Sequence, residues 1–142
     1  MSESTQSSVT AYLTVKGGLD AIAFYRRAFG AELLIQKMDG DGRRVLHAAL
    51  DVFGTMIMLS DEFPEYDPDG KSPLTVGATT FTLHVGFDDP AEVDTAMSKA
   101  AAAGCTVAMP VMDTDWGMRY GRLKDPFGHA WAFGAPLEEE SS

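Results

Sequence analysis

At 142 residues the chain has the length of one ordinary domain, long enough to form a core without disulfides or a structural metal. Twenty-one acidic against eleven basic residues give a net charge of -10, which would repel nucleic-acid backbones and anionic lipid surfaces. No apolar run approaches the roughly 18 residues of a membrane helix, and the polar start MSESTQSS is unlike a signal peptide. We therefore expect a cytoplasmic protein whose partner is a small molecule, with neither nucleic acid nor membrane involved.

The first half of the chain predicts one helix among strands. Residues 9–15 have strand character, and residues 19–29 place Leu19, Ile22 and Phe29 at helical spacing. Three further strands are predicted at residues 33–38, 45–52 and 55–59. The order is therefore βαβββ, with Phe24 or Tyr25 expected to anchor the helix to its sheet.

A segment rich in proline, aspartate and glycine follows, DEFPEYDPDGKSPLTVG at residues 61–77. Such a composition is typical of a surface connection or of a flap over a site. At its start, Asp61 and Glu62 are expected to be solvated loop charges.

The second half repeats the same order. Asp89 and Pro90 are suited to the cap and the first turn of an alanine-rich helix that ends before Gly104. The predicted strands lie at residues 80–87, 106–112, 117–123 and 129–133.

Two sequence landmarks recur at a spacing of 74 residues. DVFGTMIML begins at Asp51 and DPFGHAWAF at Asp125, each with a Phe-Gly turn followed by an apolar strand. Gly30 and Gly104, each just after a predicted helix, have the same spacing and suit left-handed helix caps. The chain is therefore predicted to contain two copies of one structural module.

These patterns predict an α+β fold of two βαβββ modules whose sheets enclose a cavity. A four-stranded sheet with one helix leaves one face bare, so the modules must cover each other's faces within the chain or across a homodimer. We expect a single domain at residues 9–134. It is divided into a first module at 9–60, the flap at 61–77 and a second module at 78–134, with a disordered N-terminus at 1–8 and an acidic tail at 135–142.

Four segments in this order also resemble a known family. They are the polar first strand, AIAFYRRAFGAEL, HAALDVFGTMIMLSDEF and WGMRYGRLKDPFGHAW, and the similarity spans about residues 9–134. Together they resemble the vicinal oxygen chelate superfamily (glyoxalases, bleomycin resistance proteins and dioxygenases), and most closely its PhnB-like branch. The resemblance implies paired modules, a ligand cavity and a homodimer, but not one particular activity.

The metal-dependent members of this superfamily take one ligand from the first strand and one from a late strand of each module. Carried over, these positions are Thr10, Ala48 or Ala49, Thr82 or His84, and Ala132. Alanine cannot bind a metal and a lone threonine hydroxyl is a weak ligand. We therefore expect no metal and no cofactor, with a divalent ion disfavoured.

The predicted ligand-binding residues are those at inward strand positions, together with a tryptophan near the mouth of the cavity. His84 is the best candidate for a catalytic or ligand-contacting group, because strand alternation puts it on the face of Thr82. If Ala49 is the metal-ligand position, strand alternation makes His47 face the cavity. If Ala48 is that position, His47 faces the core. Trp116 suits either a pocket wall or core packing. The full set is Thr10, His47, Met58, Thr82, His84, Trp116 and Ala132.

Other conspicuous residues are expected to be structural. Cys105, the only cysteine, lies in an apolar run and suits a buried thiol. His129 is expected to stabilise the turn before it by hydrogen bonding. Trp131 is expected to pack in the core. Arg119 and Arg122 alternate faces, so one of them faces the cavity unless it is used in an ion pair.

Three functions remain open at this stage. They are a metal-independent or lightly metal-assisted enzyme, a non-catalytic protein that sequesters an antibiotic or metabolite, and a divalent-metal lyase or dioxygenase with rearranged ligands. No nucleophile elbow, phosphate loop or GxGxxG motif points to another chemistry.

Overall fold

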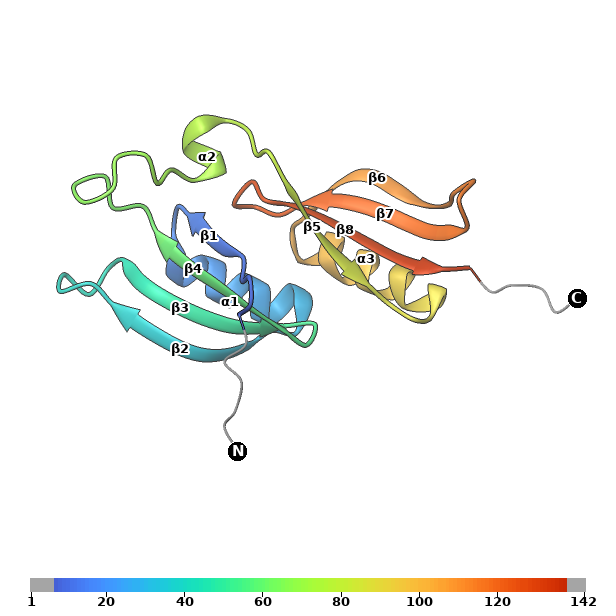
Figure 1. The fold of residues 1–142 in the computed structure, drawn as a ribbon, viewed down its shortest axis with the longest axis horizontal. Helices are drawn as coiled ribbons and strands as arrows, with labels where there is room; N and C mark the ends of the chain where they lie inside the picture. The colour runs from blue at the N-terminus through green and yellow to red at the C-terminus, as the bar shows by residue number, and fades with distance from the viewer. Residues whose placement is uncertain (1–6, 138–142) are drawn as a thin grey trace, which may run out of the picture.

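The computed structural model describes residues 7–137, so most of the predicted disordered N-terminus (1–8) and most of the predicted acidic tail (135–142) lie outside the described residues. Figure 1 shows two modules side by side along the long axis of the molecule. The first contains β1 (Tyr12–Val15), α1 (Gly18–Phe29), β2 (Glu32–Met38), β3 (Val45–Val52) and β4 (Thr55–Asp61). The second contains β5 (Thr82–Gly86), α3 (Pro90–Ala103), β6 (Thr106–Asp113), β7 (Met118–Lys124) and β8 (Ala130–Pro136).

Both sheets have the same topology. Their strand orders are β1-β4-β3-β2 and β5-β8-β7-β6, and in each the first strand runs parallel to the last. The predicted α+β class and the two βαβββ modules are therefore confirmed. A short helix that the sequence analysis did not predict, α2 (Pro73–Val76), lies in the connection between the modules.

The buried carboxylate of Asp61 accepts hydrogen bonds from the start of α1, so the expected role of Asp61 is corrected. Asp61 is buried, and its Oδ1 accepts the backbone N–H groups of Gly17 and Gly18, each at 2.9 Å. Its Oδ2 accepts the N–H of Val45 at 2.7 Å. The expectation of a solvated loop charge was wrong, because β4 continues through Asp61 and brings it beneath the helix start. Its neighbour Glu62 accepts the N–H of Ser72 at 2.6 Å and so holds the connection in place.

A second buried carboxylate, that of Asp125, joins the modules. Its Oδ2 accepts the Tyr25 hydroxyl at 2.5 Å and the indole N–H of Trp131 at 2.9 Å. Its Oδ1 accepts the N–H groups of Phe127 at 2.8 Å and His129 at 3.0 Å. Because Tyr25 belongs to α1 and the other three donors to module two, this carboxylate ties one module to the other. Tyr25 thus anchors α1 to the second module as well as lying in the core.

Aromatic rings and the two helices complete this junction. Phe29 on α1 packs against Trp131 with ring centroids 4.6 Å apart. Phe53, in the β3–β4 turn at φ 52°, reaches Phe87 and Phe133 of module two at 5.5 and 5.6 Å. Helices α1 and α3 contact each other as well. The core therefore runs from one module into the other through the helix-bearing faces of the sheets.

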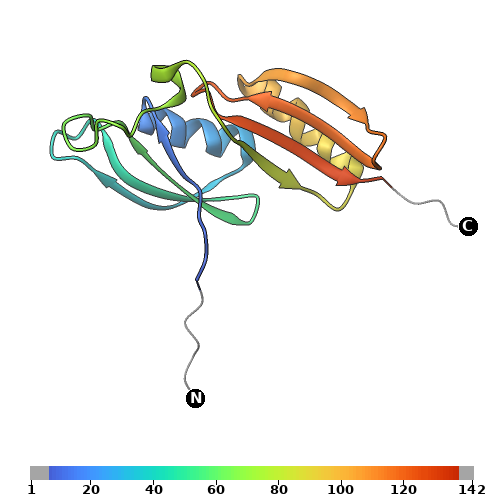
Figure 2. The same ribbon diagram turned by 45° about the horizontal axis from the view of Figure 1, so that its top comes forward.

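The opposite face of each sheet is bare within one chain. In both views the sheets lie beside each other and are not stacked (Figures 1 and 2). We call the helix-free face of the first sheet the N-face and that of the second sheet the C-face. Apolar side chains at least a third exposed remain on both, among them Tyr12 and Ile35 on the N-face and Met109 and Met112 on the C-face.

Replacing Tyr25 by Phe removes one of the four donors to Asp125 while keeping the ring. Since a hydrogen bond to a buried charge contributes about 1.5 to 3 kcal/mol, Tyr25→Phe should lower the free energy of unfolding by that amount in urea denaturation. Tyr66→Phe, at an exposed tyrosine, is the matched control and should change it by less than about 0.5 kcal/mol. Equal stability of the two variants would contradict a role for Asp125 in joining the modules.

Candidate functional site

On the N-face, a tyrosine and a histidine form a pair. The Tyr12 hydroxyl lies 2.9 Å from Nδ1 of His47, and the ring centroids are 5.6 Å apart. Ala49 pairs with Met58, and Met58 with Tyr12, so the three form one row of this face. His47, two residues from Ala49 on β3, is on the same face. Ala48 belongs to the core, which settles the two orientations left open for His47 in favour of the N-face.

On the C-face a similar pair occurs with the residue types exchanged. The rings of His84 and Tyr120 stack at 6.1 Å between centroids, with 17° between their planes. They meet above the small residues of β8, because a Cβ added to Gly134 would lie 3.0 Å from His84 and 3.4 Å from Tyr120. Ala132, in the row of His84, is 1% exposed and so lies beneath its neighbours.

Strand register makes the two pairs equivalent. Tyr12, Met58 and Ala49 form a row on the N-face, and His84, Ala132 and Arg122 form the corresponding row on the C-face. His47 and Tyr120 each lie two residues before the last member of their row. Thr82 is thereby the counterpart of Thr10, and His84 that of Tyr12. A spacing of 72 or 73 residues, close to the repeat of 74, was the signal from which Tyr12 and Tyr120 could have been found.

The two arginines of β7 have different environments. Arg119 lies on the helix side, where its guanidinium bonds Asp94 at 2.9 Å and Asp113 at 2.7 Å. Arg122 lies on the C-face, where it donates to the Thr82 hydroxyl. Of the two, Arg122 is therefore the one available to a ligand.

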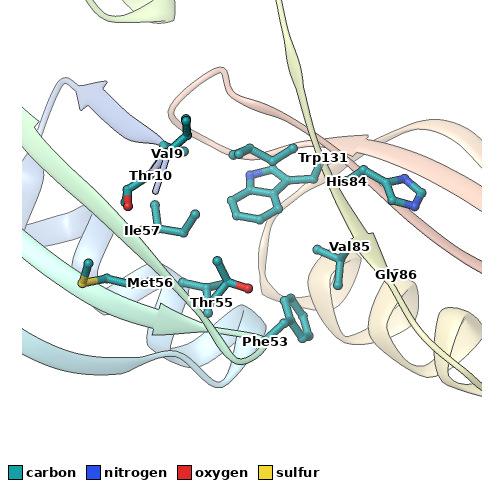
Figure 3. A pocket seen from close by; sticks show the side chains of 13 residues that line it. Val9, Thr10, Phe53, Thr55, Met56, Ile57, His84, Val85, Gly86 and Trp131 are labelled. Carbon is teal, nitrogen blue, oxygen red and sulfur yellow. The ribbon is translucent and has the colours of Figure 1, made fainter. Parts of the chain in front are cut away.

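A cleft of about 350 Å³ lies at the junction of the modules, and Figure 3 shows side chains that line it. Thr10, Met56 and Ile57 come from the first module, and Trp131, His84 and Val85 from the second. The His84 ring points away from the middle of the cleft (Figure 3). Most side chains that line the cleft are apolar, and the His84 imidazole is presented to the C-face.

The structure places the predicted ligand-binding residues in two groups. His47 and Met58 belong to the N-face and Thr82, His84 and Ala132 to the C-face, while Thr10 precedes β1 and lines the cleft. Trp116, 72% exposed in the β6–β7 turn, belongs to neither face and does not pack in the core of the chain. Only Thr10 and His84 line the same cleft. A role for these residues in ligand binding stays a prediction.

The superfamily's metal positions do not carry a suitable donor set. They are occupied by Thr10, Ala49, Thr82 or His84, and Ala132, which offer one imidazole at most. Within residues 7–137 there is no group of three His, Cys, Asp or Glu side chains that could hold an ion. The described residues thus do not fit the divalent ion of metal-dependent relatives.

A family model described as "Glyoxalase/Bleomycin resistance protein/Dioxygenase superfamily" matches residues 9–133. The chain belongs to this superfamily. The expected family is therefore confirmed.

Individual proteins are similar to this chain in sequence or in fold. The uncharacterized protein Mb0911c from Mycobacterium bovis is 36% identical over 98% of this chain and 90% of its own. The PhnB protein from Bacillus cereus shares the fold with a TM-score of 0.68 at 22% identity, over 93% of this chain and 100% of its own. The fosfomycin resistance protein FosX from Listeria monocytogenes also shares the fold, with a TM-score of 0.68 at 16% identity, over 94% of this chain and 93% of its own. Its structure holds Mn(II) and a sulfate ion.

Two further observations concern the rest of the chain. None of the helices described at residues 7–137 has the length and apolar character needed to cross a membrane. Cys105 is buried, and burial together with the Asp125 charge raises the pKa of its thiol to about 12. Because the thiolate is the nucleophile, this cysteine is inert at neutral pH, in line with its expected structural role.

The histidines should differ in their effect on stability. His129 is buried, and its Nε2 lies 3.0 Å from the Thr14 carbonyl oxygen across the module junction, whereas His84 is exposed. His129→Ala should therefore lower the free energy of unfolding by about 2 to 4 kcal/mol. His84→Ala should change it by about 0.5 kcal/mol or less. Urea denaturation checks both, and a larger loss for His84→Ala would reverse the assignment.

Proposed function

We propose that the protein binds a small organic molecule, without a metal ion, in a cavity formed when the N-face of one protomer meets the C-face of a second. The observation that carries the proposal is the pair of matching bare faces, each with a Tyr–His pair among exposed apolar side chains. A monomer leaves these side chains in water, which is unfavourable for such a large apolar area.

Twofold symmetry suits this arrangement. In a symmetric dimer each contact occurs twice, so the N-face of either copy meets the C-face of the other and two equal cavities result. Because the faces have the same topology and equivalent rows, neither copy is left with an unpaired face. The homodimer expected from the sequence is thus the assembly that completes the site.

The composition of the faces favours an organic ligand. Methionines at Met56, Met58, Met109 and Met112 offer flexible apolar contacts that adapt to an irregular molecule. The two histidines and two tyrosines supply a few oriented hydrogen bonds near neutral pH. A metal-dependent reaction is disfavoured because threonine and alanine occupy most of the superfamily's ligand positions. His84 is the best candidate should the bound molecule also undergo proton transfer.

The dimer is tested by light scattering. The wild-type protein should have twice the 15.3 kDa mass of the chain at micromolar concentration. Ile35→Asp and Met109→Asp place a charge on the N-face and the C-face respectively and should each shift the mass toward the monomer. Leu19→Asp, at an exposed leucine of α1, should leave the dimer intact. A monomeric wild-type protein would refute the proposal.

Ligand binding is tested by a thermal-shift screen of small organic molecules. A ligand at 100 times its dissociation constant should stabilise the folded dimer by about 2.7 kcal/mol. The shift should be the same with and without EDTA, and Met58→Asp should abolish it. A shift that requires added divalent metal, or one that Met58→Asp leaves unchanged, would contradict metal-free binding in this cavity.

A further inference from the structure

We infer that the C-face holds an oxyanion subsite formed by Arg122 and Thr82, so that the ligand of this protein is an organic anion. This inference rests on the proposed function and adds the charge of the ligand to it. Arg122 is half-buried without a carboxylate partner, in a chain with nearly twice as many acidic as basic residues.

Arg122 differs from the other two half-buried arginines, Arg44 and Arg119. The guanidinium of Arg44 lies within 4 Å of the carboxylates of Asp39, Asp41 and Glu65. Arg119 is held by Asp94 and Asp113. For Arg122, by contrast, the described residues supply no carboxylate within 4 Å, and its side-chain partner is the neutral hydroxyl of Thr82. A half-buried guanidinium with a neutral partner retains N–H donors that match a carboxylate or phosphonate.

The rows of the C-face around Arg122 contain no acidic residue. The row of Thr82 continues through Ala130 and Lys124 to Thr106, and that of His84 through Ala132 and Arg122 to Met109. The next row joins Gly86, Gly134, Tyr120 and Met112. These twelve positions hold two cations, a histidine and no Asp or Glu, in a chain whose net charge is -10. Their field therefore attracts an anion.

The geometry gives the anion a defined place. Small residues on β8, Ala130, Ala132 and Gly134, form the floor between β5 and β7. Arg122 and Thr82 meet from opposite sides of this floor, next to the stacked rings of His84 and Tyr120. An oxyanion at Arg122 would thus lie beside two flat rings, which suits an acid attached to an aromatic or other flat apolar body.

The equivalent row of the N-face differs at the decisive position. Ala49 occupies the place of Arg122, and Met58 that of Ala132. In the proposed cavity the C-face would bind the charged end of the ligand, and the methionines of the N-face its apolar end. A single orientation of the bound molecule follows.

The test uses benzoate and benzamide, which have similar shapes and differ in charge. Each is titrated into the ¹⁵N-labelled full-length protein, and the backbone amide shifts of β5 and β7 are followed by NMR. Benzoate should shift the amides near Thr82 and Arg122, and benzamide should not. Phenylphosphonate, titrated in the same way, establishes whether the subsite prefers a planar or a tetrahedral oxyanion.

Arg122→Gln should weaken benzoate binding at least about tenfold, since a hydrogen bond between charged groups contributes about 1.5 to 3 kcal/mol. Arg43→Gln, an equal charge change at an exposed loop arginine, should leave the dissociation constant within about twofold. The dispersion of the NMR spectrum verifies that each variant is folded.

Several results would overturn the subsite. One is that benzoate shifts only amides outside the C-face, and another is that it shifts none. The others are that benzamide binds as tightly as benzoate, or that Arg122→Gln leaves the dissociation constant for benzoate unchanged. So would an ion pair between Arg122 and a carboxylate of the second protomer. In each case a dimeric protein that still binds neutral molecules would leave the proposed function standing. A monomeric wild-type protein that still binds benzoate at Arg122 would instead retain the subsite and refute the dimeric cavity.

Discussion

The buried carboxylate of Asp125 determines how the two modules meet. Removing a carboxylate from water is costly, and here the cost is offset by four donors that converge on its two oxygens. One of them, the Tyr25 hydroxyl, comes from the other module. Burial, with the Asp125 charge beside it, holds the pKa of the Tyr25 hydroxyl well above its usual value, so it remains a donor throughout the physiological range. The corresponding Asp51 of module one accepts only the N–H of Gly54 among the bonds of the described residues.

This difference between the two copies of the repeat has consequences for the whole chain. Because α1 is drawn toward the turn that contains Asp125, the helix-bearing sides of both sheets merge into one core. The other sides are left bare, with their Tyr–His pairs outward. A site that needs both faces would then have to be completed by a second copy. The constraint that stabilises the monomer would then also explain why the proposed cavity requires a dimer.

Much of the fold could be predicted from sequence because it is encoded locally. Gly30 and Gly104 end the two helices, and the Phe-Gly turns precede strands that begin within a residue or two of the predicted positions. The role of Asp61 could not be predicted in this way, because its partners Gly17 and Val45 lie far away along the chain. The same holds for the junction at Asp125, since a sequence with two similar modules does not specify which of their faces meet.

Strand alternation and the 74-residue repeat allow the sheet face of a residue to be predicted only where that residue lies in a strand. His84, Thr82 and Met58 could be assigned to one face of their sheets from their strand positions, and the structure places them on the helix-free faces. Trp116 could not, because a tryptophan in a turn has no alternation to fix its direction. The pairing of Tyr12 with His47 was missed since it requires the register between β1, β4 and β3.

Isotope-filtered NMR on mixed dimers tests the central claim most directly. Protein labelled with ¹³C is mixed with unlabelled protein, and nuclear Overhauser effects between the two copies are recorded. The account predicts contacts from the methyl group of Met58 or the side chain of Ile35 in one copy to Met109 or Met112 in the other. Intermolecular contacts confined to the helices α1 and α3, or contacts that join two N-faces, would contradict it.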